Sequence, residues 1–186
     1  DRATGKIEQT AVQTAAFLGL TFSPDGRTLY ASGGNQDVVY RYAWSGNRAT
    51  LTDSLVLAAK TRPNGTRYPA SVAPSVDGKF LYVTENLADS LAVIDLATRK
   101  VVQRLATERY PYGVVTTSDG TVFVSSWGGS TVSVFVRGPS GTLTLERRIT
   151  VGRHPSALLL NADGSRLFVA SASTDRCEIM IDRAHE

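Results

Sequence analysis

Short runs of alternating hydrophobic and polar residues follow one another along the whole chain, separated by turns that contain glycine. In Pro111–Val136 three such runs are separated by Asp119-Gly120 and by Gly128-Gly129-Ser130. Alternation with a period of two is typical of β-strands, and Asp-Gly favours a tight hairpin because glycine accepts a positive φ. The pattern therefore predicts three consecutive antiparallel strands in this stretch.

The same pattern occurs four times. Its turns are Asp25-Gly26, Asp77-Gly78, Asp119-Gly120 and Asp163-Gly164. They lie 52 (77−25), 42 (119−77) and 44 (163−119) residues apart. Several short strands in a repeat of 40 to 50 residues are typical of β-propeller blades, and no segment of useful length has helical periodicity. We predict an all-β fold with four four-stranded blades, at about residues 15–57, 68–106, 110–151 and 154–182.

The fourth repeat lacks an outer strand, and residues 6–13 predict a spare strand before the first repeat. Asp1–Lys6 resembles Asp95–Lys100, where a third strand turns into a fourth, so we expect the chain to begin at such a turn. The spare strand could complete the last blade and close a four-blade ring that leaves no open edges. We favour the alternative, a part of a larger seven- or eight-bladed propeller, because wedge-shaped blades of this type usually need more than four to close.

The composition excludes several classes of protein. Of the 186 residues 42% are hydrophobic and 20% charged, which is ordinary for a folded globular protein. A net charge of +3, spread evenly, is too small to favour nucleic-acid binding. No run of 18 apolar residues predicts a membrane span. With one cysteine and two histidines we expect no internal disulfide, no bound metal and no cofactor.

The candidate chemistry lies in the loops that lead into the inner strands. Arg67-Tyr68, Arg109-Tyr110 and Arg153-His154 occupy equivalent positions before a proline in three repeats. Arginine binds carboxylates and phosphates through paired hydrogen bonds, and the neighbouring rings can stack on a ligand. This arrangement predicts an anion-binding rim around the channel. In the alternative interpretation each arginine pairs with an acidic residue or a carbonyl group of the next blade.

The loops between second and third strands add residues to the same face. They contribute Asn35, Glu85, Asn86 and Trp127 to the candidate ligand surface. Glycines beside Trp127 would let a ligand approach its ring, although such a tryptophan more often covers a blade edge. No motif places a nucleophile or an orienting carboxylate beside His154, so we interpret it as a rim residue rather than a general base. We expect the four turn aspartates on the opposite face, as turn formers rather than metal ligands.

The residues Phe80–Asn86, Ser90–Asp95 and Leu20–Tyr30 resemble the YVTN family of bacterial β-propeller repeats. Ser125–Gly129 and Tyr110–Gly113 are similar to a narrower group, in which the propeller precedes a phosphoesterase domain of the alkaline-phosphatase type. The residues of this chain include no such catalytic domain, so the resemblance does not extend that activity to it. The resemblance implies a propeller exported to the periplasm or to the cell surface.

From these observations we expect a non-catalytic binding or interaction module. An anionic small molecule, a glycan or a partner protein would bind at the face that carries arginine, tyrosine and tryptophan. The remaining propeller blades or a second copy of the chain are further candidate partners. The alternative functions are a lactonase-like or other propeller hydrolase, and an accessory propeller of a phosphoesterase.

Overall fold

The structure is a computed structural model that describes residues 1–59, 63–174 and 176–181. Within these residues the chain forms four antiparallel sheets, each in simple up-and-down order. Blade 1 contains β1 (Leu20–Phe22), β2 (Thr28–Ser32), β3 (Val38–Ser45) and β4 (Arg48–Val56). Blade 2 contains β5 (Pro69–Pro74), β6 (Phe80–Glu85), β7 (Ser90–Asp95) and β8 (Lys100–Ala106).

The other two sheets follow the same plan. Blade 3 contains β9 (Pro111–Thr116), β10 (Val122–Ser126), β11 (Thr131–Arg137) and β12 (Leu143–Thr150). Blade 4 contains β13 (Pro155–Leu160), β14 (Arg166–Ser171) and β15 (Arg176–Ile181). Short 3-10 turns, η1 (Gly34–Gln36) and η2 (Asn86–Ala88), precede the third strands of blades 1 and 2.

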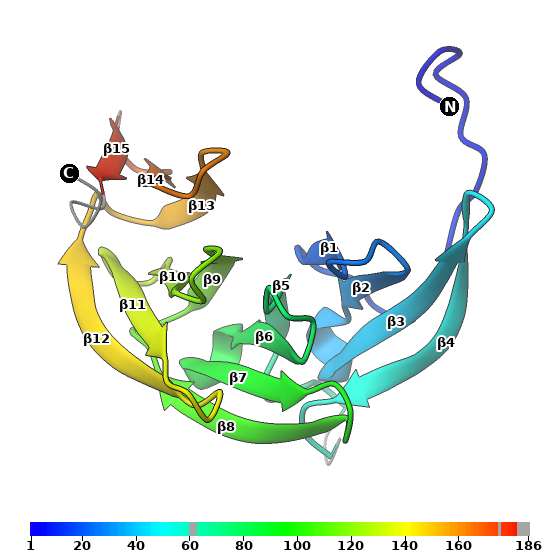
Figure 1. Cartoon of the computed structure of the whole chain (residues 1–186), viewed down its shortest axis with the longest axis horizontal. Coiled ribbons are helices and arrows are strands. Elements are labelled where there is room, and N and C mark those ends of the chain that lie inside the picture. Colours follow the sequence, from blue (N-terminus) through cyan, green and yellow to red (C-terminus); the bar gives the residue numbers. More distant parts are fainter. Residues whose placement is uncertain (60–62, 175, 182–186) are drawn as a thin grey trace.

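The four sheets stand side by side in an arc, with their first strands on the inside (Figure 1). Consecutive inner strands are in contact, from β1 to β5, from β5 to β9 and from β9 to β13. This arrangement is that of propeller blades around a channel, and the predicted all-β fold with four blades is confirmed. Within the described residues no helix is long and apolar enough to cross a membrane.

The four Asp-Gly turns form as predicted. Gly26, Gly78, Gly120 and Gly164 have φ of +69°, +66°, +92° and +76°. The aspartate side chain closes each turn by accepting backbone N–H bonds, for example from Arg27 at 3.1 Å to Asp25 and from Lys79 at 3.2 Å to Asp77. A side chain that bonds its own turn in this way explains why Asp recurs beside each glycine.

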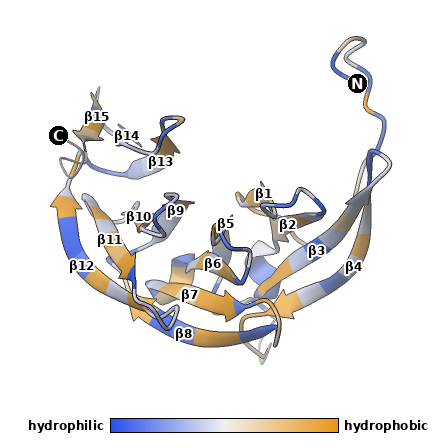
Figure 2. Ribbon diagram, viewed as in Figure 1, coloured by the Kyte–Doolittle hydropathy of each residue, from blue (hydrophilic) through white to orange (hydrophobic). Residues whose placement is uncertain are grey.

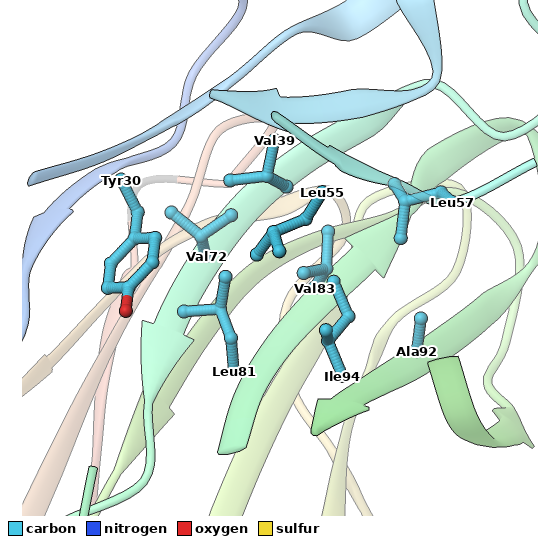
Figure 3. Close-up of a cluster of buried hydrophobic side chains, with 9 residues drawn as sticks. All are labelled: Tyr30, Val39, Leu55, Leu57, Val72, Leu81, Val83, Ala92 and Ile94. Carbon is cyan, nitrogen blue, oxygen red and sulfur yellow. The ribbon is translucent and has the colours of Figure 1, made fainter. Parts of the chain in front are cut away.

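The hydrophobic core lies between the blades rather than inside any one sheet. Side chains from blades 1 and 2 meet in one cluster (Figure 3), which consists of Tyr30, Val39, Leu55, Leu57, Val72, Leu81, Val83, Ala92 and Ile94. A second cluster joins blades 2 and 3, and a third joins blades 3 and 4. Along the outer strand β12 a hydrophilic segment lies between hydrophobic segments, as Figure 2 shows. Each blade is therefore stabilised mainly by its neighbours.

Polar contacts add to this packing between blades. The Gln103 side chain forms two bonds with the backbone of Leu143, donating at 2.8 Å and accepting at 3.0 Å. Arg137 of blade 3 donates to Asp77 of blade 2 at 2.9 Å. Arg99 of blade 2 lies 3.0 Å from Asp53 of blade 1. These contacts connect neighbouring sheets in addition to their apolar packing.

Two segments differ from the expectation. The first inner strand begins at Leu20 and not at Phe17. Gly19 approaches the backbone of blade 2 closely, so the segment before Leu20 forms only isolated hydrogen bonds to Ser32 instead of regular strand pairing. Residues 6–13 form no strand; Gln9 bonds instead to the backbone of Ala49 in blade 1. The predicted end of blade 4, at residue 182, lies outside the described residues.

Candidate functional site

The loops that lead into three inner strands share an unusual backbone conformation. Tyr68, Tyr110 and His154, each followed by proline, have φ of 53°, 54° and 57°. Large side chains rarely adopt this left-handed conformation, and such strain persists only where the surroundings enforce it. This backbone conformation recurs at the equivalent position of three blades. It is therefore a repeated structural feature of this end of the channel. We call the surface formed by these loops the channel mouth.

Hydrogen bonds to two blades hold each of these residues. The N–H groups of Tyr68 and Tyr110 donate at 2.9 Å to the carboxylates of Asp37 and Asp89, which belong to the preceding blades. The carbonyl groups of the same tyrosines accept bonds from Asn86 and Trp127 in their own blades, at 3.1 and 2.9 Å. The mouth is thus built from pairs of blades, and no single blade contains it.

Asp37 accepts more of these hydrogen bonds than Asp89 does. It was not among the residues predicted for the site. It is buried and accepts bonds from the N–H groups of Thr66, Arg67 and Tyr68, at 2.6, 2.9 and 2.9 Å. A signal was present in the sequence, since Asp37 and Asp89 are 52 residues apart (89−37), like the first two turn aspartates. The repeat could therefore have identified both.

Aromatic rings gather at the mouth. Phe17 packs edge-on against Tyr68 and Tyr112, with ring centres 5.1 and 6.1 Å apart. Trp127 and His154 stack with ring centres 4.4 Å apart and planes 24° apart. A hollow of about 350 Å³ is lined by Asn86, Tyr110, Tyr112 and Trp127. Tyrosine and tryptophan present both flat apolar faces and polar edges, so the hollow offers surfaces for stacking and for hydrogen bonds.

The glycines beside Trp127 allow this arrangement. A Cβ atom on Gly128 would lie 2.5 Å from the ring of Tyr110. Trp127 is 39% exposed, so its ring is accessible to a ligand despite the stack with His154. The sequence prediction that glycine permits close approach here agrees with the geometry, although the group that approaches is a tyrosine.

The three rim arginines have different surroundings. The guanidinium group of Arg67 lies 3.7 Å from the carboxylate of Glu85, so it is already partly neutralised. Arg109 is exposed, lies 5.3 Å over the ring of Tyr110 and has no carboxylate within ion-pair distance among the described residues. Arg153 is likewise exposed, and no described carboxylate pairs with it. The accessible positive charge of the mouth therefore lies at blades 3 and 4.

Glu85 points into the protein. Its side chain is fully buried and accepts bonds from Arg104 at 3.0 and 3.2 Å and from the hydroxyl of Ser90 at 2.6 Å. Arg104 also donates to the carbonyl of Leu57 in blade 1 at 2.6 Å. Buried carboxylates need such partners. The geometry gives Glu85 a structural contact between blades.

The two asparagines also bond to neighbouring loops. Asn86 donates to the carbonyl of Pro111 at 3.2 Å and still lines the hollow. Asn35 accepts from the N–H of Gly65 at 2.7 Å and donates to Asn64. The amide of Asn86 is thus adjacent to the candidate ligand space, whereas Asn35 organises the loop before blade 2.

His154 has a backbone partner. Its Nδ1 lies 2.7 Å from the carbonyl oxygen of Trp127, so the neutral ring that donates this bond carries its proton on Nδ1. In a catalytic dyad a carboxylate would orient the histidine ring and stabilise its protonated form. The carbonyl group of Trp127 only orients the ring of His154. This geometry suits a rim residue that holds Trp127 in place.

The turn aspartates lie at the other end of the blades. The pKa values of Asp25, Asp77, Asp119 and Asp163 are all held below the ordinary value by hydrogen bonds within and around their turns. For Asp77 the largest cause is the bond from Arg137. No group of three or more His, Cys, Asp or Glu side chains suited to a metal ion occurs in the described part of the chain.

The fold and this mouth define a β-propeller whose candidate ligand surface is aromatic and positively charged. The chain belongs to the family described as the SMP-30/Gluconolactonase/LRE-like region, whose model matches residues 57–173. A comparison with curated proteins gave no match.

Solved structures confirm the propeller fold. The chain is similar to a candidate 6-phosphogluconolactonase of Bacteroides uniformis, with a TM-score of 0.79, 16% identity and coverage of 94% of this chain and 56% of that one. A β-propeller domain of Myceliophteria thermophila gives a TM-score of 0.77, 14% identity and coverage of 97% and 60%. The periplasmic gluconolactonase of Pseudomonas aeruginosa gives a TM-score of 0.61 and 21% identity, with coverage of 81% of this chain and 48% of that one. The chain thus spans about half the length of the structures that it matches.

Proposed function

We propose that the chain is a binding module that holds an anionic, polyhydroxylated small molecule of the sugar-acid type at the channel mouth. The observation that carries the proposal is the hollow lined by Tyr110, Tyr112 and Trp127, next to the guanidinium group of Arg109, which contacts Tyr110 and has no carboxylate partner among the described residues. The rings offer flat faces to the C–H groups of a sugar, while Asn86 and the tyrosine hydroxyls can bond its hydroxyl groups. Arg109 would bind the carboxylate or phosphate.

The family supports this class of ligand. Gluconolactonase is part of the family description and of the name of one structural relative, and another relative is named as a candidate 6-phosphogluconolactonase. A lactone of this kind is the cyclic ester of a sugar acid. The ligand inferred from the side chains therefore belongs to the chemistry that these names describe.

A second candidate is hydrolysis of such a lactone, which the family membership favours. Glu85 is buried in its contacts with Arg104 and Ser90, and His154 is oriented by a backbone carbonyl group rather than by a carboxylate, which is why we place binding first. The resemblance to YVTN repeats supports a third role, that of an accessory propeller for a phosphoesterase. It also supports export from the cytoplasm, which cell fractionation would test.

Titration calorimetry with 6-phosphogluconate, gluconate and glucose tests the proposal. We expect affinity to fall in that order, because negative charge is lost at each step. Arg109→Ala should weaken 6-phosphogluconate binding at least 10-fold and leave glucose unchanged, since a hydrogen bond to a charged group contributes about 1.5–3 kcal/mol. Arg109→Lys should recover part of the loss. Arg147→Ala, which removes an exposed arginine of β12, is the matched control.

Two results would contradict the proposal. Equal affinity for glucose and 6-phosphogluconate would show that the site does not recognise the negatively charged group of the ligand. Turnover of gluconolactone, measured with and without added divalent metal, would replace binding by hydrolysis if it also depended on Arg109. Binding without turnover supports the module as proposed.

A further inference from the structure

Blade 3 repeats the hydrogen-bond donors that surround Glu85 in blade 2 without repeating the carboxylate. The Glu85 side chain accepts from Arg104 at 3.0 and 3.2 Å and from Ser90 at 2.6 Å. The guanidinium group of Arg67 lies 3.7 Å from the same carboxylate. Ser126 occupies the position of Glu85 in blade 3, because each is the last residue of a second strand and alternates with residues packed against the preceding blade. A short, neutral side chain therefore replaces the carboxylate.

The three donor positions are kept in blade 3. Two are equivalent by strand register, and the third by the left-handed tyrosine that follows it. In both blades the arginine of the outer strand lies opposite a small residue, Ser133 or Ala92, which leaves room for its guanidinium group to cross the sheet. The counterparts are Thr131 for Ser90, Arg148 for Arg104 and Arg109 for Arg67.

None of these donors of blade 3 has a carboxylate partner within the described residues. The hydroxyl groups of Ser126, Thr131 and Ser133 are buried, and none of them has a hydrogen-bond partner in that part of the chain. The guanidinium group of Arg109 contacts the ring and the hydroxyl of Tyr110 instead. Buried polar groups are normally paired, so donors grouped without an acceptor indicate a place for one.

Two acidic side chains flank the loop that contains Arg109. Asp89 accepts a bond from the N–H of Tyr110 at 2.9 Å. Glu108 lies over Gly129, and its Oε2 is 2.6 Å from the place that a Cβ atom of Gly129 would take. Neither carboxylate forms an ion pair within the described residues, so neither neutralises the arginines of blade 3.

We propose that blade 3 binds the carboxylate of a ligand at the position where blade 2 has the carboxylate of Glu85. Arg109, Arg148 and the hydroxyl of Thr131 are its donors. The inference rests on the proposed function for the rest of the ligand. Because Arg109 and Ser126 immediately precede Tyr110 and Trp127, the site adjoins the hollow in which the hydroxyl groups of a sugar acid would lie. A carboxylate is favoured over a phosphate because the same set of donors holds a carboxylate in blade 2.

Titration calorimetry with gluconate and glucose 6-phosphate separates a carboxylate from a phosphate at this position. Arg148→Ala should weaken gluconate binding about 10-fold, because a hydrogen bond to a charged group is lost. It should leave the binding of glucose 6-phosphate unchanged. Arg148→Lys should recover part of the loss, since lysine keeps the charge without the paired geometry. Arg147→Ala is the matched control, because Arg147 pairs with Val134 and points to the other face of β12.

A carboxylate introduced into the chain tests the position without any ligand. Ser126→Glu places it where Glu85 stands in blade 2, so this variant should no longer bind gluconate. Ser126→Gln adds a side chain of the same size without the charge. In urea unfolding at pH 7 Ser126→Glu should be more stable than Ser126→Gln. Adding Arg148→Ala to both variants should remove this difference, because the introduced carboxylate then loses its partner.

These results separate the inference from the proposed function. If neither gluconate nor 6-phosphogluconate binds, the proposed function fails, and the comparison of Ser126→Glu with Ser126→Gln still decides the inference. If gluconate binding depends on Arg109 but not on Arg148, the proposed function stands and the carboxylate site is wrong. Equal losses for gluconate and glucose 6-phosphate in Arg148→Ala would also overturn the inference, as would a Ser126→Glu variant no more stable than Ser126→Gln.

Discussion

At the scale of single residues, the left-handed tyrosines and histidine show how the mouth is made. Tyr68 and Tyr110 keep a strained backbone because an aspartate of the preceding blade binds their N–H groups. The strain turns their rings towards the channel end, where Phe17, Tyr112 and Trp127 surround them. Strained residues held in this way are found disproportionately at functional sites.

Asp37 provides the first prediction. Asp37→Ala should lower the free energy of unfolding by about 3 kcal/mol, because three partly buried N–H groups, of Thr66, Arg67 and Tyr68, lose a charged acceptor. Asp37→Asn keeps one acceptor oxygen and tolerates the left-handed backbone, so its loss should be about half as large. Urea unfolding of the two variants measures the difference. Equal losses would mean that the number of bonds to Asp37 does not matter.

Asp77 provides a prediction about pH. The bond from Arg137, at 2.9 Å, holds the pKa of Asp77 below its unfolded value, with help from Ser75 and Lys79. A carboxyl group whose pKa is lower in the folded state stabilises the protein above its unfolded pKa, and this contribution disappears as the pH falls through the folded pKa. Stability should therefore decrease below about pH 4, where the unfolded chain begins to bind the proton.

The variant Asp77→Asn isolates this effect. It should cost up to about 1 kcal/mol at pH 7, since the pair is partly exposed and screened by solvent. It should also flatten the pH dependence of unfolding between pH 4 and pH 2 relative to the wild type. Asp163→Asn removes a turn aspartate whose pKa is lowered mainly by hydrogen bonds from Ser165, with only a small effect of the Arg166 charge, and serves as the comparison. An unchanged acid profile in Asp77→Asn would show that the ion pair is unimportant.

At the scale of elements, glycines have two separate roles. Gly26 lies in an open turn with φ of 69°, and a Cβ atom there would contact nothing within 4 Å. Gly19 lies at the start of the first inner strand, and a Cβ atom there would be 2.6 Å from the carbonyl oxygen of Ala70 in blade 2. The first role concerns the backbone of one hairpin, and the second concerns the distance between two blades.

Alanine substitutions separate these roles. Gly26→Ala should cost about 1 kcal/mol of unfolding free energy, through the positive φ alone. Gly19→Ala should cost about 2–3 kcal/mol, because the methyl group pushes blades 1 and 2 apart. Chemical denaturation of both variants gives the comparison. A smaller loss for Gly19→Ala than for Gly26→Ala would contradict the close packing of the inner strands.

The elements also show what could be predicted from the sequence. The hairpins followed from Asp-Gly and from alternating hydrophobic residues, because those signals are local. The pairing of Glu85 with Arg104 could not be predicted, since it depends on how two strands and a neighbouring blade meet in space. Residues 6–13 had the composition of a strand, but strand pairing needs a partner edge, and Gln9 binds the face of blade 1 instead. Three arginines occupy equivalent positions in the sequence repeat: Arg67, Arg109 and Arg153. In the structure they have different partners, which the repeat could not predict.

At the scale of the whole molecule, neighbouring blades depend on one another. Each interface combines an apolar layer with a few polar bonds, and each rim residue is held by two blades. A ligand at the mouth would contact blades 2, 3 and 4 through Asn86, Tyr110 and the stack of Trp127 on His154. Binding should therefore depend on how blades 2, 3 and 4 are arranged relative to one another.

The fluorescence of Trp127 tests the central claim most directly. Trp44→Phe leaves Trp127 as the sole tryptophan and keeps an aromatic ring beside Phe22. Titration of this variant with 6-phosphogluconate should change the emission of Trp127 along a saturable curve, with a midpoint that rises at least 10-fold in Arg109→Ala. Glucose should produce a weaker change that is insensitive to Arg109. An emission spectrum that stays constant up to millimolar 6-phosphogluconate would contradict a sugar-acid site at the channel mouth.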